Sequence, residues 1–199
     1  MDSVDPRLKD IAEIRSLMEQ SSKFLSLSGL SGVSAGTAGL LAYLVANHQV
    51  STARMQSPES LTVFFCAEAT VTLVCALGMA VFFSTRMARR KGLPLWTPAT
   101  RALLVSLLIP LAAGGVYSLI LLSRGLFSLI APAMLVFYGL ALLSSSKYTL
   151  AEIRTLGLSE LLLGLAGTLW TEYGLLAWGI GFGLLHILYG TSMYFKYEK

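Results

Sequence analysis

Long apolar stretches recur along nearly the whole chain, and they constrain the fold more than any other feature of the sequence. Each has roughly 20 residues, which at a rise of about 1.5 Å per residue is enough to cross a hydrocarbon core about 30 Å thick. Hydrophobic residues make up 55% of the 199 residues and charged residues 13%, whereas a soluble domain carries about a quarter charged residues. The sequence therefore predicts an all-α membrane protein, a bundle of transmembrane helices with no separate soluble domain.

Six stretches are predicted to span the membrane: residues 25–46, 60–85, 100–122, 126–146, 152–172 and 174–195. The fifth is the weakest, because its apolar part is short and contains Glu160. We keep it because Lys196 and Lys199 would otherwise lie outside. The predicted organisation is a cytoplasmic amphipathic helix over residues 1–24, followed by a six-helix transmembrane domain over residues 25–199.

The distribution of Lys and Arg sets the expected orientation. These residues resist translocation and accumulate in cytoplasmic loops. With the N-terminus inside, Arg54 and Arg124 are the only basic residues of the chain left outside. Both termini are therefore expected on the cytoplasmic side.

The segment before the first span has the pattern of an amphipathic helix. Asp5 is placed as its N-cap and Pro6 as its first helical residue, and apolar residues then recur at helical spacing. Its acidic and basic residues balance, whereas attachment to anionic lipid needs an excess of basic residues. We expect this helix to contact protein, either the chain's own loops or a protein partner.

Small residues mark one face of the first span and one face of the sixth. They are Gly32 and Gly36 in the first, and Gly179, Gly183 and Gly190 in the sixth. Such faces let two helix backbones approach closely where lipid gives no hydrophobic drive for association. Two explanations are open: packing against another helix of the same chain, or formation of a homodimer.

Three ionisable residues lie inside predicted spans and form the candidate intramembrane polar site: Glu68, Glu160 and His186. Such side chains are costly in lipid and usually face protein or water. His186 shares a helical face with the glycines of the sixth span, so its partner should be a hydroxyl, a backbone carbonyl freed by a kink, or Glu160. Glu160 and His186 are each thirteen residues from Tyr173, and an antiparallel hairpin would place them at equal depth. A structural hydrogen bond and a role in binding a ligand, an ion or a proton are both open.

Two prolines, Pro110 and Pro132, are predicted to interrupt the third and fourth spans. A proline inside a helix frees a carbonyl and kinks the chain. Such kinks either fit a bundle together or line a substrate site.

The densest cluster of charge follows the second span and consists of Arg86, Arg89, Arg90 and Lys91. Determination of topology explains this cluster, and a site for anionic lipid is the alternative. The basic residues are scattered over membrane loops with no recognition module, which speaks against nucleic-acid binding. The chain also lacks zinc, phosphate-loop and nucleophile-elbow motifs, so we predict no catalytic residue, metal or cofactor.

Four short strings resemble a family of small bacterial multi-span membrane proteins: residues 21–32, 108–111, 131–132 and 181–186. The resemblance covers essentially the whole chain. It implies six spans and a bacterial inner-membrane location, with the lipid bilayer as surroundings. It supplies no activity and no site residues.

Two classes of function fit these observations. A non-catalytic scaffold, regulatory or accessory component is favoured by the cytoplasmic charge and the amphipathic N-terminal helix. A small transporter or channel is the alternative, favoured by the prolines, Glu68 and His186. A polar cavity that reaches Glu68 or His186 would favour transport, and a tightly packed dry bundle would count against it.

Overall fold

The computed structural model describes residues 27–52 and 58–199, and this part of the chain is helical with no strands. The long helices are α2 (Gly29–Thr52), α3 (Pro58–Arg90), α4 (Pro98–Ser123), α5 (Ile130–Ser145), α6 (Glu152–Leu169) and α8 (His186–Tyr197). Short elements complete the chain: η2 (Phe127–Leu129), η3 (Ser146–Tyr148), η4 (Thr171–Tyr173), α7 (Gly174–Trp178) and η5 (Gly179–Leu185). The amphipathic helix predicted over residues 1–24 lies outside the described residues.

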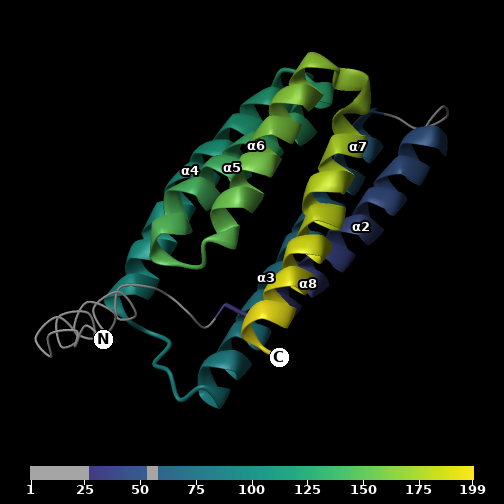
Figure 1. Cartoon of the computed structure of the whole chain (residues 1–199). Coiled ribbons are helices and arrows are strands. Elements are labelled where there is room, and N and C mark those ends of the chain that lie inside the picture. The colour runs from purple at the N-terminus through teal and green to yellow at the C-terminus, as the bar shows by residue number, and fades with distance from the viewer. Residues whose placement is uncertain (1–26, 53–57) are drawn as a thin grey trace, which may run out of the picture.

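Consecutive helices run antiparallel, and the C-terminal helix lies in the middle of the arrangement (Figure 1). We use this name for α7, η5 and α8, which follow one another without a break. On one side it packs against α6 and α5, and α4 covers α5. On the other side it packs against α2, and α3 covers α2.

Five helical stretches are long and apolar enough to cross a membrane: Gly29–Thr52, Glu59–Arg90, Pro98–Ser123, Phe127–Tyr148 and Thr171–Tyr197. They correspond to five of the six predicted spans. The remaining prediction, residues 152–172, falls on α6, which is a helix of 18 residues packed along α5. Three charged residues, Glu152, Arg154 and Glu160, lower its apolar character. That α6 crosses the membrane therefore stays a prediction.

Local sequence signals set several helix ends. Thr97 caps α4: its hydroxyl oxygen accepts a hydrogen bond from the Thr100 backbone N–H at 3.1 Å, and Pro98 takes the first helical position. Gly92 follows α3 with φ +64° and Gly125 follows α4 with φ +72°. This left-handed conformation costs a residue with a side chain more than it costs glycine, so these glycines stop the two helices.

The prolines do not interrupt the helices as the sequence suggested. Helix α4 continues through Pro110 from end to end. Pro132 is the third residue of α5, because that helix begins only at Ile130, after a 3₁₀ turn. N–H groups in a first turn have no partner within the helix, so this proline breaks no interior hydrogen bond. It is instead a buried packing residue against α6 and α7.

The glycines of the first and last spans face one another inside the chain. A Cβ added to Gly32 would lie 2.9 Å from the Cα of Gly190, and one added to Gly36 would lie 2.7 Å from the carbonyl oxygen of Gly183. A Cβ on Gly179 would lie 2.5 Å from the ring of Tyr43. The structure thus shows the first of the two explanations, packing of small faces within one chain.

The last turn of the chain is tied to two other helices. The Glu198 carboxylate accepts hydrogen bonds from the Gly29 backbone N–H and, at 3.2 Å, from the Ser28 hydroxyl, which caps the start of α2. Lys196 pairs with Glu152 at the start of α6, with 2.5 Å between Nζ and Oε1. These contacts hold one end of the C-terminal helix against α2 and α6.

We predict that Gly190→Ala lowers stability while Gly115→Ala does not. A Cβ on Gly190 would lie 2.5 Å from the backbone nitrogen of Val33, so α2 must move, at a cost of about 1–3 kcal/mol. A Cβ on Gly115 meets nothing within 4 Å, and alanine gains about 1 kcal/mol of helix propensity over glycine. Thermal unfolding of the purified protein in detergent measures both variants. Equal midpoints would contradict the proposed close packing.

Candidate functional site

Three polar side chains meet where α5, α6 and the C-terminal helix come together. They are Tyr138 from α5, Glu160 from α6 and His186 from the first position of α8, and we call them the polar cluster. Glu160 has no exposed surface and His186 is 7% exposed. The cluster is therefore inside the bundle and closed off from lipid.

The hydrogen bonds of His186 define its tautomer. Its Nδ1 lies 2.9 Å from the Gly181 carbonyl oxygen, which can only accept, so Nδ1 carries a hydrogen and donates it. Its Nε2 lies 2.8 Å from the Tyr138 hydroxyl. In a neutral imidazole with hydrogen on Nδ1, Nε2 is an acceptor, so the Tyr138 hydroxyl donates to it. Both ring nitrogens are thus satisfied.

Glu160 approaches the same imidazole but forms no hydrogen bond to a described residue. Its Oε1 lies 3.4 Å from Nδ1 of His186. Neither of its carboxyl oxygens has a hydrogen-bond partner in the described part of the chain. The carboxyl group rests on Gly181, where an added Cβ would run into Oε2 and would lie 2.5 Å from Cδ2 of Leu135. Glycine at position 181 is what makes room for this carboxyl group.

A π-helical segment brings Gly181 and His186 together. Residues Gly179–Leu185 wind as a π-helix, with more residues per turn than an α-helix. Residues five apart diverge on an α-helix and come close to alignment on this wider turn, which lets the His186 side chain reach the Gly181 carbonyl. Single wide turns of this kind are frequent at functional sites.

Aromatic rings hold the imidazole in place. The Phe182 ring lies nearly parallel to that of His186, with centroids 5.9 Å apart and planes 17° apart. The same ring lies 4.8 Å from Tyr138 and 5.2 Å from Trp178, centroid to centroid. Packing on two sides restricts rotation of both polar rings and keeps the hydrogen bond between them aligned.

The structure brings two of the three predicted polar residues together and leaves the third elsewhere. The predicted contact between Glu160 and His186 is present. Glu68 is half-buried on α3, which packs against α2, and its Oε1 has no partner among the described residues. The candidate site is therefore Glu160 and His186 with Tyr138, and Glu68 stands apart from it.

Sequence reasoning missed Tyr138 as a named partner and Gly181 as the seat of the carboxyl group. A hydroxyl and a freed carbonyl were expected partners of His186, and the structure supplies both. Gly181 was missed because faces were counted at the α-helical period, and a π-helical turn shifts them. The alternation of Gly179, Gly181 and Gly183 was the available signal.

The cluster can hold one proton in several places. Tyr138, His186 and Glu160 form a row of a phenol, an imidazole and a carboxyl group, with the imidazole within reach of both neighbours. Such a row can relay a proton if water reaches either end. Among the described residues, no three His, Cys, Asp or Glu side chains gather to hold a metal ion.

Comparison with protein-family models, with curated proteins and with solved structures finds no match for this chain. The resemblance to small bacterial membrane proteins therefore stays a prediction, and the site is interpreted from its own chemistry.

We predict that His186→Leu destabilises the bundle more than Glu160→Leu. Removing the imidazole orphans the Tyr138 hydroxyl and the Gly181 carbonyl and leaves Glu160 without a facing donor, at a cost of about 1–3 kcal/mol for each buried polar group left unpaired. Removing the carboxyl group leaves both imidazole nitrogens satisfied. Unfolding in detergent measures the two single variants.

The double variant Glu160→Leu/His186→Leu is the control for this prediction. It should be more stable than His186→Leu alone, because it no longer buries a lone carboxyl group. A Glu160→Leu variant as unstable as His186→Leu would contradict the assignment of hydrogen bonds.

Proposed function

We propose that this chain is a six-span protein of the bacterial inner membrane that acts as a non-catalytic scaffold, regulatory or accessory component. The observation that carries the proposal is the closure of the polar cluster. Glu160 is fully buried, Gly181 and Leu135 pack directly on its carboxyl group, and His186 is held by two hydrogen bonds. A group that served transport would need a route for water or substrate, whereas these contacts are those of a tie between helices.

The distribution of charge supports an orientation with both termini in the cytoplasm. Helices α3, α5 and α8 finish at the same end of the bundle at which α2, α4 and α6 start (Figure 1). Arg124 is the only Lys or Arg of the described residues at the opposite end. Such a bias is typical of a cytoplasmic face.

The outer helices support an accessory role. None of the 18 most apolar residues of α3 is buried within the fold, and almost none of those of α4. Lipid can cover both helices, and so can the helices of another membrane protein. A small protein with two such apolar flanks suits assembly with a larger partner.

A small transporter or channel is the second candidate, and one observation favours it. Both carboxyl oxygens of Glu160 lack a hydrogen-bond partner among the described residues, which is an expensive state inside a membrane. A carboxyl group that exchanges a proton with His186 during transport would explain why such a cost is tolerated.

Reporter fusions test the proposed topology. A periplasmic reporter fused after Val50 or Arg124 should be active, and one fused after Arg90, Lys147 or Lys199 should be silent. The expected pattern follows from six crossings, including one by α6. An active reporter after Lys199 would mean that α6 or the C-terminal helix does not cross.

Two measurements separate the proposed role from the alternative. Mild-detergent purification of the tagged full chain from native membranes, followed by mass spectrometry, should recover a stoichiometric membrane partner. Proteoliposomes that contain the purified chain should show no proton flux under a pH gradient. A flux that Glu160→Gln abolishes and Glu68→Gln leaves intact would overturn the proposal in favour of the transporter.

A further inference from the structure

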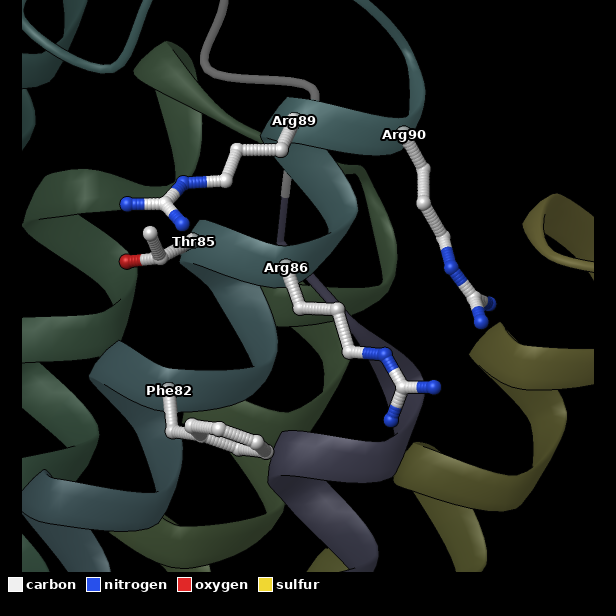
Figure 2. Close-up of a pocket in the computed structure, with 5 residues that line it drawn as sticks. All are labelled: Phe82, Thr85, Arg86, Arg89 and Arg90. Atoms are coloured by element: carbon white, nitrogen blue, oxygen red, sulfur yellow. The ribbon is translucent and has the colours of Figure 1, made fainter.

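A hollow of about 530 Å³ lies at the basic end of α3. Its lining consists of one aromatic ring, one hydroxyl and three guanidinium groups: Phe82, Thr85, Arg86, Arg89 and Arg90. Figure 2 shows Arg86 and Arg90 extended on the same side of α3, with Arg89 beside Thr85. All three arginines are exposed, so the hollow opens to the surroundings of the helix.

The spacing of these residues makes a continuous stripe along the last turns of α3. Phe82, Arg86 and Arg90 follow one another at intervals of four, and Thr85 and Arg89 repeat that interval next to them. Residues three and four apart are neighbours on a helix surface. The stripe therefore passes from an apolar ring through a hydroxyl to a group of cations.

The positive charge of the hollow is not neutralised by the described part of the chain. Glu152 and Glu198 are the acidic residues described at this end of the bundle. Glu152 is paired with Lys196 and accepts from the Tyr197 hydroxyl, and Glu198 caps α2. No described carboxylate lies within ion-pair distance of the three arginines. The anion that balances them has to come from elsewhere.

The length of α3 places the stripe at the level of lipid headgroups. Its 33 residues give a length of about 50 Å, whereas the hydrocarbon core is about 30 Å thick. The uncharged stretch between Glu68 and Arg86 ends at the hollow, so Phe82 lies near the acyl boundary and the arginines lie beyond it. Phosphate groups of the bilayer lie at this level, and guanidinium groups bind phosphate oxygens in pairs.

We propose that this hollow binds the phosphate of an anionic phospholipid, with the three guanidinium groups as counter-charges and an acyl chain along Phe82. Orientation by cytoplasmic charge needs basic residues but no hollow, and it does not need an aromatic ring one turn deeper. The proposal goes beyond the role proposed above, because it requires only that α3 crosses a membrane.

Titration of the purified full chain in mild detergent tests this site. Short-chain phosphatidylglycerol is the probe, and native mass spectrometry counts the bound lipid. Arg86→Gln/Arg89→Gln/Arg90→Gln should weaken binding by about tenfold or more, since each lost charged contact removes part of the phosphate cradle. The matched control Lys147→Gln/Arg154→Gln/Lys199→Gln removes three charges at the same end outside the hollow, and it should change binding by less than about twofold.

Two further arms keep the result unambiguous. Arg86→Lys/Arg89→Lys/Arg90→Lys preserves net charge and topology, so it remains informative if the glutamine variant does not assemble. It should weaken binding by about threefold or more, because an ammonium group cannot form the paired contact. Glycerol 3-phosphate, which has the phosphate without acyl chains, should bind far more weakly than the lipid.

Three outcomes would overturn the proposal. One is an equal loss of binding in the glutamine variant and its matched control, which would mean attraction by net charge alone. Another is binding of glycerol 3-phosphate as tight as that of the lipid, which would mean a site for a soluble phosphate. The third is the absence of phosphatidylglycerol binding to the unaltered chain.

Discussion

The close approach of α2 to the C-terminal helix is the contact on which the rest of the bundle depends. Helix α3 packs mainly on α2, and α4, α5 and α6 pack on the other side of the C-terminal helix, so this one interface joins the two halves. Lipid provides no hydrophobic drive for helix association, and van der Waals contact between backbones has to replace it. Gly32, Gly36 and Gly190 allow that contact because no side chain keeps the two backbones apart.

The C-terminal helix has a second task on its opposite side, where it presents His186 to α5 and α6. The π-helical turn that serves this purpose gives up the regular hydrogen-bond ladder, and the His186 side chain takes up the Gly181 carbonyl. Inside a membrane an unpaired polar group costs several kcal/mol, by general estimates about as much as a few packed methyl groups contribute. The histidine thus both repairs the helix and ties it to Tyr138. Glu160 is the member of the cluster that structure alone does not require, which is why it separates the two proposed roles.

Charge at the end of the bundle follows a different logic from charge inside it. Glu152 and Glu198 are used within the fold, where they hold the last turn of the chain against α6 and α2. The arginines at the end of α3 have no such partner among the described residues and face outward. Inside the bundle, burial makes an unpaired group expensive, whereas at the headgroup level anionic lipid offers a counter-charge at little cost.

The sequence by itself determined the helical class, the number and bounds of the helices to within a few residues, and the equal depth of Glu160 and His186. These follow from local quantities: apolar length, capping residues such as Thr97, and counting along an antiparallel hairpin from Tyr173. Only the tertiary structure decided that the glycine faces of α2 and the C-terminal helix cover each other, that Tyr138 completes the cluster, and that Pro132 packs rather than kinks. Each of these depends on which helices become neighbours and on a π-helical turn that shifts the faces. Pairing of distant helices is set by the fit of whole surfaces, and no local pattern in one helix specifies the surface it will meet.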